Sequence, residues 1–386
     1  MKLRKDKWAN VKIKDCCEIL DNLRKPISAI ERERRIENKK QEELYPYYGA
    51  TGLVGWVDDY LIDDQYVLIG EDGAPFFDKS KDIAYLIKGK SWVNNHVHIL
   101  KAKPKIADDI YILHYLNSFN DFGGYVNGTT RLKLNKGQLE RIPIPLPPLE
   151  EQKQIAALFQ SIETAMEQVD GQEKNLKALW KKLIDEFVSD KPSFGNLLKG
   201  KKLKTYNYCE VTEKLMRKID PLTYGIERIV AGENLESEDF KIRTWQKVGE
   251  GYLGPAFHVL FKAGDILYGS RRTYLRKVSH ADFDGVCANT TYVIRANEEL
   301  LLQDLLKHIM LSERFTQYSI GVSKGSTNPY INWKDLDNFS FQVPDLETQR
   351  DIINVLDGIL QIVEQLKQQK TTLKHLKQKL LNEILG

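Results

Sequence analysis

An internal repeat constrains the fold of this 386-residue chain more than any other feature. Residues 128–188 align without a gap to residues 325–385, an offset of 197 positions, and 19 of the 61 aligned residues are identical. The period is about half of the chain, which excludes a solenoid of short repeats and indicates a duplicated architecture. A chain of this length is also expected to form more than one folding unit.

The repeated core predicts one long helix in each half of the chain. Apolar residues recur at every seventh position and form the predicted seam: Ile155, Ile162, Val169, Leu176 and Leu183, then Ile352, Ile359, Leu366, Leu373 and Leu380. A companion line is predicted at Leu158, Ala165, Leu179, Val355, Ile362 and Leu376. Such heptads are typical of a coiled coil. The alternative, in which each helix stays within its own domain, would leave one seam without a partner.

Both copies place a polar residue at the same seam positions, Gln172 with Gln369 and Glu186 with Glu383. A polar side chain in an apolar seam lowers stability but can fix the register. We expect the two helices to pair antiparallel about a pseudo-twofold axis near their midpoints, with Gln172 and Gln369 about one layer apart. The alternative is that these glutamines face solvent.

The segments before the helices predict two globular units of mixed α and β structure. Strands are expected at 66–69, 92–100, 265–268 and 290–294, and helices at 106–119 and 300–318. The expected fold is α+β, with two α/β domains separated by two long antiparallel helices. The predicted boundaries are 1–148 for the first domain, 149–190 for its helix, 191–345 for the second domain and 346–386 for its helix.

Basic and aromatic residues indicate where nucleic acid would bind, because arginine bonds guanine edges and phosphates. The second unit carries a cluster within sixteen residues, and the first unit has scattered candidates. The predicted DNA contacts are Arg24, Lys25, Tyr48, Thr51, Asn94, Asn95, Thr130, Arg131, Lys133, Tyr268, Ser270, Arg271, Arg272, Tyr274, Arg276, Lys277, Thr327 and Asn328. A solvated basic face is the alternative explanation for the cluster.

Composition limits the remaining possibilities. The net charge of +3 is too small to indicate a nucleic-acid partner without local clustering. No apolar run approaches the ~20 residues of a membrane span, and the charged start is unlike a signal peptide, so a cytoplasmic location is expected. The four cysteines lack metal spacing and are expected to be reduced and mostly buried.

Catalytic motifs are incomplete throughout the sequence. Residues 195–202 differ from a phosphate-binding loop at the final hydroxyl position, and Asn328-Pro329-Tyr330 lacks one proline of the amino-methyltransferase motif. His96 and His98 share a face without a third metal ligand nearby, so packing or DNA contact is expected instead. Gly70-Glu71-Asp72-Gly73 is expected to be a turn. We therefore predict neither an active site nor a metal site in this chain.

Several segments together resemble the specificity subunits of type I restriction-modification systems. They are YPYYGATGLVGWVDDYL (45–61), LIGEDGAPF (68–76), SWVNNHVHIL (91–100), IPIPLPPLEEQKQIA (142–156), GDILYG (264–269), ANTTYVI (288–294), NPYINWKDL (328–336) and FSFQVPDLETQRDII (339–353). The resemblance covers nearly the whole chain, and unit two matches less closely by motif than unit one.

The resemblance implies a non-catalytic DNA reader whose two target-recognition domains bind an asymmetric, two-part sequence. It further implies assembly with two methyltransferase subunits, which methylate adenine N6, and through them with restriction subunits. S-adenosylmethionine, ATP and Mg²⁺ would then be bound by the partner subunits, with no cofactor in this chain. The alternatives are a self-sufficient DNA adenine methyltransferase, which would need a cofactor loop, and a coiled-coil adaptor that does not bind DNA.

Overall fold

A computed structural model describes residues 5–78, 81–250 and 254–386 of the chain. The chain forms two compact units, the first from residues 1–169 with 368–386 and the second from residues 170–367. These units cut across the four predicted segments, because each long helix contributes part of its length to each unit. Among the described residues, no helix is long and apolar enough to cross a membrane.

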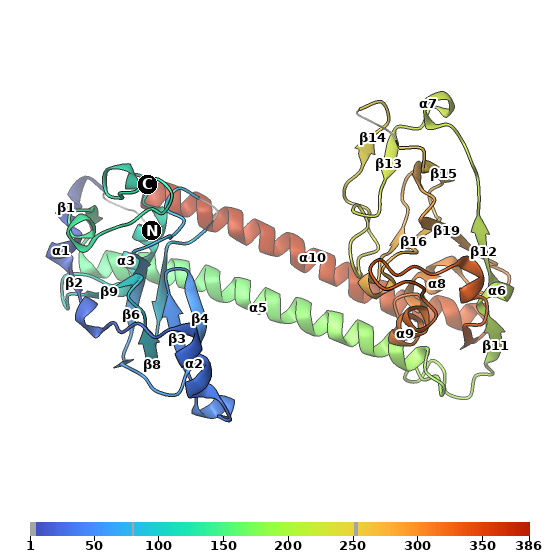
Figure 1. The fold of residues 1–386 in the computed structure, drawn as a ribbon, viewed down its shortest axis with the longest axis horizontal. Coiled ribbons are helices and arrows are strands. Elements are labelled where there is room, and N and C mark those ends of the chain that lie inside the picture. The colour runs from blue at the N-terminus through green and yellow to red at the C-terminus, as the bar shows by residue number, and fades with distance from the viewer. Residues whose placement is uncertain (1–4, 79–80, 251–253) are drawn as a thin grey trace. The chain divides into compact units, whose positions relative to one another are not determined.

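The first unit contains two four-stranded sheets and a two-stranded pair (Figure 1). The central sheet has the order β2 (Cys17–Ile19), β9 (Val97–Ala102), β6 (Tyr66–Gly70), β7 (Ala84–Ile87). The second sheet has the order β4 (Gly52–Val57), β3 (Tyr45–Gly49), β8 (Lys90–Val93), β5 (Ile62–Asp63), in which only β3 and β8 run parallel. Strand β1 (Ala9–Lys12) pairs with β10 (Pro143–Leu146).

Helix α3 (Asp109–Ser118) packs against the central sheet of the first unit. Its N-cap is Asp108, whose carboxylate accepts hydrogen bonds from the backbone N–H groups of Ile110 and Tyr111. The predicted helix began at residue 106, three residues too early, because this cap defines the first turn. The shorter helices of the unit are α1 (Ile13–Cys16), α2 (Ala29–Ile36) and α4 (Lys136–Leu139), with 3₁₀ turns η1 (Lys5–Lys7), η2 (Asp21–Leu23), η3 (Gln41–Glu43) and η4 (Phe122–Gly124).

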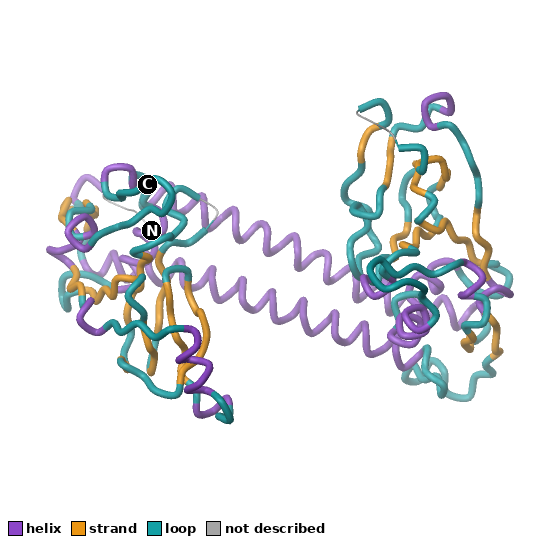
Figure 2. The backbone as a smooth tube through the Cα atoms, in the orientation of Figure 1, coloured by secondary structure: helices purple, strands orange, loops and turns teal. Residues whose placement is uncertain are grey.

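The second unit repeats this topology strand for strand. Its central sheet has the order β12 (Thr212–Leu215), β19 (Thr291–Ala296), β16 (Ile266–Gly269), β17 (Val278–His280). Its second sheet has the order β14 (Gln246–Lys247), β13 (Arg228–Val230), β18 (Gly285–Ala288), β15 (Phe257–Phe261), again with one parallel neighbour, β13 beside β18. Strand β11 (Lys204–Asn207) pairs with β20 (Ser340–Val343). Figure 2 shows that loops make up much of each unit between its strands.

The helix predicted at 300–318 is two helices, α8 (Gln303–Ile309) and α9 (Glu313–Gly321). The break has a local cause, because the Ser312 hydroxyl accepts a hydrogen bond from Phe315 N at 3.2 Å and starts a new helix. The other helical segments are α6 (Tyr208–Val211), α7 (Pro221–Tyr224), η5 (Thr273–Leu275) and η6 (Trp333–Leu336).

The two long helices are α5 (Leu149–Phe187) and α10 (Leu346–Ile384), and they pack antiparallel as predicted. In the first unit the beginning of α5 shares a core with the end of α10, including Ile155, Phe159 and Leu381. In the second unit the end of α5 shares a core with the beginning of α10, including Trp180 and Ile352. The predicted fold class, with mixed α/β units and two paired long helices, is therefore confirmed.

The first predicted seam line is buried or half-buried, whereas four of the six predicted companion positions are exposed and Leu158 and Ala165 are half-buried. Ile155, Ile162, Val169, Ile352 and Leu366 are buried, and Leu176, Leu183, Ile359, Leu373 and Leu380 are half-buried. The companion positions Leu179, Val355, Ile362 and Leu376 are 45%, 41%, 47% and 43% exposed. Buried residues instead lie four positions after the first line, at Phe159, Trp180, Phe187, Leu356 and Val363. The buried residues therefore follow one another at intervals of four and then three positions, as in Ile155, Phe159 and Ile162. The prediction had used intervals of three and then four, as in Ile155, Leu158 and Ile162.

Gln172 and Gln369 are both exposed. Their exposure agrees with the solvent-facing alternative for the individual side chains. Gln172 belongs to the second unit and Gln369 to the first, and the register between them stays a prediction.

The four cysteines are all free thiols, and Cys16, Cys17 and Cys287 are buried while Cys209 is exposed. This agrees with the prediction of reduced, mostly buried cysteines.

Candidate nucleic-acid interface

Each unit presents two loops that hydrogen-bond to each other beside its central sheet, and we call them the paired loops. In the first unit they are residues 71–74, which follow β6, and residues 127–134. Gly73 N donates to Leu132 O at 3.0 Å, and Leu134 N donates to Glu71 O at 2.8 Å. These two bonds fix the position of the turn that follows the central strand.

The second unit contains the same arrangement in residues 270–273, which follow β16, and residues 324–331. Arg272 N donates to Pro329 O at 2.7 Å, and Ile331 N donates to Ser270 O at 2.9 Å. The acceptor and donor positions 132, 134, 329 and 331 are related by the repeat offset of 197. The paired loops are therefore a duplicated element of the fold.

A glycine opens the second loop of each pair because the turn requires a positive φ. Gly128 has φ of 102° and Gly325 has φ of 87°. A Cβ atom on Gly128 would also lie 2.4 Å from Arg131 O. The turn is closed by the reciprocal backbone bonds of Asn127 with Lys133, at 2.9 and 2.8 Å. This explains why these two glycines are identical in the repeat.

The side chains on the paired loops of the first unit form a mixed-charge network. Lys133 Nζ lies 3.2 Å from Glu71 Oε1 and 3.6 Å from Asp72 Oδ1, and His96 Nδ1 lies 3.2 Å from Asp72 Oδ2. Burial disfavours the charged carboxyl of Asp72, but the hydrogen bond from His96 and the charge of Lys133 hold its pKa below the ordinary value. Arg131 is exposed beside this network. This face therefore offers carboxylate acceptors as well as cationic donors.

The paired loops of the second unit are cationic and aromatic at the equivalent positions. Arg271 takes the place of Asp72, since Arg271 forms a β-bridge with Tyr330 and Asp72 forms one with Lys133. Arg272 is exposed and adopts the left-handed conformation with φ of 50°, which is unusual for a residue other than glycine. Such backbone strain is concentrated at functional sites.

Other exposed side chains surround these arginines. Tyr274 is 51% exposed and Tyr330 is 42% exposed, and Thr327 and Asn328 are exposed on the second loop. Arginine, tyrosine and small polar groups together can contact phosphates and base edges. The structure therefore brings Arg271, Arg272, Tyr274, Thr327 and Asn328 together on one surface.

Several predicted DNA contacts do not fit the structure because their side chains are buried or used internally. Tyr268 is 2% exposed and Ser270 is 4% exposed, and the Ser270 hydroxyl donates to Thr290 O at 2.6 Å. The side chain of Arg276 is 10% exposed and ion-pairs with Glu313 at 2.7 Å. Lys277 is half-buried, and its Nζ donates to Gly232 O at 2.5 Å. The polar groups of these residues are therefore used within the fold of the second unit.

Arg24 is also a structural residue in the first unit. Its guanidinium ion-pairs with Asp21 at 3.1 Å and with Glu71 at 2.5 Å, and it donates to Val97 O at 2.7 Å. These bonds occupy the N–H groups that the prediction assigned to DNA. The sequence showed the positive charge of Arg24 but not the two carboxylates that folding brings to it.

Of the other candidates of the first unit, Thr130 and Arg131 lie on the second of the paired loops and the rest lie outside them. Asn94 is buried, and its Oδ1 accepts a hydrogen bond from His96 N at 2.8 Å, so it is also a poor DNA contact. Tyr48 is half-buried against Tyr85, with ring centroids 5.8 Å apart. The exposed candidates are Lys25, Thr51, Asn95, Thr130 and Arg131.

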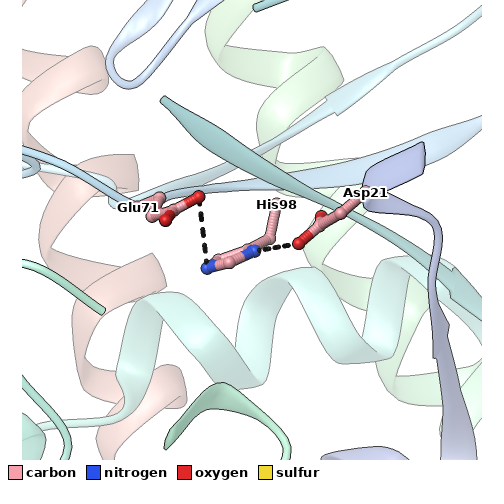
Figure 3. Close-up of side chains that lie close together, drawn as sticks. All are labelled: Asp21, Glu71 and His98. Atoms are coloured by element: carbon pink, nitrogen blue, oxygen red, sulfur yellow. Dashed lines mark hydrogen bonds and ion pairs between the residues drawn. The ribbon is translucent and has the colours of Figure 1, made fainter. Parts of the chain in front are cut away.

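Asp21, Glu71 and His98 form a compact cluster whose donor atoms lie within 4.8 Å of one another (Figure 3). Figure 3 shows the His98 ring between the two carboxylates. Two carboxylates and an imidazole are ligands that suit a divalent cation. In this structure, however, both ring nitrogens already have hydrogen-bond partners: His98 Nδ1 lies 2.7 Å from Asp21 Oδ2, and Nε2 lies 2.7 Å from Leu134 O. Both ring nitrogens are engaged and Arg24 binds both carboxylates, so these residues form a charge network.

Sequence analysis missed the residues that hold the paired loops in place. His98 bonds Leu134 O in the first unit, and the Tyr292 hydroxyl donates to Ile331 O at 2.6 Å in the second. Leu134 and Ile331 are related by the repeat offset, so an equivalence was visible in the sequence. Nothing in the residue types indicated that histidine and tyrosine would serve the same purpose.

Comparison with known proteins agrees with this duplicated arrangement. The family model of the type I restriction modification DNA specificity domain matches twice, at residues 5–178 and 194–375. A putative type I restriction enzyme specificity subunit, S.HindORF215P of Haemophilus influenzae, is 27% identical over 89% of this chain and 85% of its own length. The MjaVIII specificity subunit of Methanocaldococcus jannaschii is 24% identical over 98% of this chain and 92% of its own length.

Solved structures share the fold. The S subunit of a type I restriction-modification system from M. genitalium matches with a TM-score of 0.61 at 13% identity, covering 99% of this chain and 97% of that chain. A chain from a study of complex assembly and conformational transition of the type I system matches with a TM-score of 0.55 at 17% identity, covering 99% of this chain and 98% of the other. The similarity thus extends over both units.

Proposed function

Since the chain belongs to the family of type I restriction-modification DNA specificity subunits, we propose that it is the subunit that chooses the DNA sequence for such a complex. The family predicted from the sequence is confirmed by the two matched domains. In this proposal each unit reads one half of an asymmetric, two-part site. The chain then positions methyltransferase subunits, which act on adenine N6, and restriction subunits.

The observation that carries the proposal is the pair of unlike surfaces built on one topology. Equivalent loop positions hold Asp72 in the first unit but Arg271 in the second. Carboxylates accept hydrogen bonds from cytosine N4, whereas arginine donates to guanine. A single chain with two different readers suits an asymmetric site, whereas a symmetric homodimer suits a palindrome.

The long helices have two roles in the proposal. Each has 39 residues, or about 58 Å at 1.5 Å per residue, and would set the spacing between the half-sites. Their exposed apolar line would also bind the partners. In the second unit, Val355 and Ile362 stand seven positions apart on α10, and with Leu179 on α5 they are 41–47% exposed. Exposed apolar patches often mark protein–protein contacts.

The catalytic steps belong to the partners in this proposal. This chain is a non-catalytic subunit that acts in the cytoplasm, and S-adenosylmethionine, ATP and Mg²⁺ bind to the methyltransferase and restriction subunits. A self-sufficient methyltransferase and an adaptor without DNA binding are less well supported, because the chain matches the DNA specificity family along both units.

Mapping of methylated adenines in the source genome tests the proposal directly. We expect one asymmetric two-part motif to be methylated in the wild-type strain and to lose methylation when this gene is deleted. The control is complementation with the intact gene, which should restore the same motif. Unchanged methylation in the deletion strain would contradict the proposal.

The partner surface has its own test. Changing Ile362 to Glu should abolish co-purification with the methyltransferase subunit, because a charge replaces an exposed apolar contact. Gln361→Glu is the matched control, since Gln361 is an exposed neighbour on the same helix. Both variants should keep the thermal stability of the free chain. Equal co-purification of the two variants would place the partner elsewhere.

A further inference from the structure

Each unit has a third loop beside its paired loops, and we call it the asparagine loop. It is residues 94–96, between β8 and β9, in the first unit and residues 289–290, between β18 and β19, in the second. Its last carbonyl group accepts a hydrogen bond from the turn that follows the central strand, from Glu71 N at 2.8 Å in the first unit and from Ser270 N at 3.0 Å in the second. The same backbone bond therefore fixes this loop against the paired loops in both units.

The register of the central sheets places an asparagine at the same point of each asparagine loop. Asn95 lies two residues before the first paired residue of β9, and Asn289 lies two residues before the first paired residue of β19. Those first residues pair with Gly70 and Gly269, which end the central strands β6 and β16. Both asparagines are exposed, and Asn289 was not among the predicted DNA contacts.

The fold does not explain why asparagine occurs at these two positions. Asparagine is common in turns because it tolerates a positive φ or bonds its own backbone. Neither Asn95 nor Asn289 is among the described residues with a positive φ, and neither side chain makes a hydrogen bond to a described residue. The neighbouring Asn94 differs, because its Oδ1 accepts a hydrogen bond from His96 N at 2.8 Å and so stabilises the turn. Both exposed amides are therefore available to a ligand.

The surroundings of the two asparagines differ in charge. Asp72 lies beside the first asparagine loop, where its Oδ2 is 3.2 Å from His96 Nδ1. The equivalent residue beside the second asparagine loop is Arg271, which is exposed. Two surfaces that differ at this position but share an asparagine suit two half-sites that differ in some bases and have one base in common.

The side-chain amide of asparagine matches adenine among the bases. In the major groove its Nδ2 can donate to adenine N7 while its Oδ1 accepts from the amino group at adenine N6. In the proposed function both half-sites contain an adenine, because adenine N6 is the atom that the partner subunit methylates. Adenine is therefore the base that the two half-sites are required to share.

We propose that Asn95 and Asn289 are specificity-determining residues that each read an adenine, Asn95 in the first half-site and Asn289 in the second. The paired loops beside them read the bases by which the half-sites differ. This inference rests on the proposed function, in which each unit reads one half of the site.

Alanine substitutions test the two asparagines separately. Binding of the assembled complex to duplexes that are altered at one base pair at a time gives the base preference at every position of the site. Asn95→Ala should lower the preference for adenine at one position of the first half-site by about tenfold to hundredfold and leave the second half-site unchanged. Asn289→Ala should have the same effect on the second half-site alone.

A matched control and a second pair of variants separate base reading from folding. Asn175→Ala is the control, since Asn175 is an exposed asparagine on α5, and its change should leave every base preference unaltered. Asn95→Asp and Asn289→Asp keep the shape of the side chain but lose the N–H donor to adenine N7, so each should lose the adenine preference as the alanine variant does. They replace the alanine variants if melting curves show that those do not fold.

An adenine analogue identifies the atom that is contacted. The base 7-deazaadenine lacks the N7 acceptor but still pairs with thymine. At the position found with Asn95→Ala, the analogue should weaken binding by the wild-type complex about as much as the substitution does. It should not weaken binding by the Asn95→Ala complex further, because the two changes remove the same interaction. Losses that add in full would overturn the inference.

The outcomes also distinguish this inference from the proposed function. Absence of sequence-selective DNA binding by the wild-type complex would refute the proposed function. Selective binding that is unchanged in Asn95→Ala and Asn289→Ala would retain the proposed function and overturn the role of the asparagines. Equal weakening on all sequences would identify a phosphate contact and would also overturn it.

Discussion

Gln152 and Gln349 make the same three hydrogen bonds in the two halves of the chain. Gln152 Oε1 accepts from Asp108 N at 3.0 Å, and its Nε2 donates to Ile106 O and Pro147 O at 3.0 and 2.8 Å. Gln349 bonds Leu302 N, Leu300 O and Pro344 O at 3.0, 2.9 and 3.0 Å. Both side chains are fully buried, and each attaches a long helix to the unit in which that helix begins.

Replacing Gln152 with Ala should destabilise the first unit by about 3 kcal/mol, because one buried and two partly buried hydrogen bonds to backbone groups are lost. Thermal or denaturant unfolding of the full chain would measure this loss. Gln154→Ala is the matched control, since Gln154 is exposed two residues away on the same helix and its change should be nearly neutral. Similar melting curves for both variants would contradict the anchoring role.

The exposed arginines of the second unit should contribute to sequence choice. Arg271→Ala or Arg272→Ala should weaken DNA binding by the assembled complex by ~1–3 kcal/mol and relax selection in one half-site, if the guanidinium contacts a base. Binding to duplexes altered in either half, measured over a range of salt concentrations, checks this. Equal weakening on all sequences with a shallower salt dependence would identify a phosphate contact instead.

A ruler role for the helices predicts a change in the gap between half-sites. Inserting one matched heptad into both α5 and α10 adds about 10 Å at 1.5 Å per residue, or about three base pairs. Methylation mapping should then show the same two half-sites with a longer gap. An unchanged gap, in a variant that still folds and methylates, would rule out the ruler.

A buried histidine should make the first unit sensitive to acid. Burial lowers the pKa of His114 from 6.5 to about 4, so the unfolded chain binds this proton more readily than the folded chain does. His114 therefore contributes stability that is complete above pH 6.5 and is lost as the pH falls toward 4. Between about pH 7 and about pH 5 the loss is roughly 2 kcal/mol.

The variant His114→Met should reduce this acid sensitivity, because the side chain no longer takes up a proton on unfolding. Melting curves of the full chain at both pH values would show it as a smaller difference in midpoint. His375→Gln is the control, because His375 is exposed on α10 and its loss should leave the pH dependence unchanged. A pH dependence of His114→Met that matches the wild type would assign the effect to other groups.

The heptads show how far the sequence pattern reaches and where it stops. The spacing of Ile155, Ile162 and Val169 correctly predicted two long helices and one buried line. It could not decide between Leu158 and Phe159 for the companion line, since both lie on the same side of an isolated helix. Packing onto the globular part of each unit selected Phe159, which is fully buried.

The sequence could not show which predicted DNA contacts are engaged within the fold, for a related reason. Arg24 and Arg276 look like Arg271 and Arg272 in the sequence, since each is a cation in a polar segment. Folding brings Glu71 to Arg24 and Glu313 to Arg276 from 47 and 37 residues away, respectively. Arg271 and Arg272 instead follow a strand on an exposed loop and stay available.

The sequence alone determined the duplication, the two long helices, the mixed α/β units and the family, because these depend on periodic and repeated patterns that the chain carries locally. The tertiary structure decided which side chains reach the surface and which hold the loops from within. His98 and Tyr292 have no resemblance as residue types, yet the register of two sheets gives them the same carbonyl to hold. Such equivalence depends on distances between residues far apart in the chain, which only folding fixes.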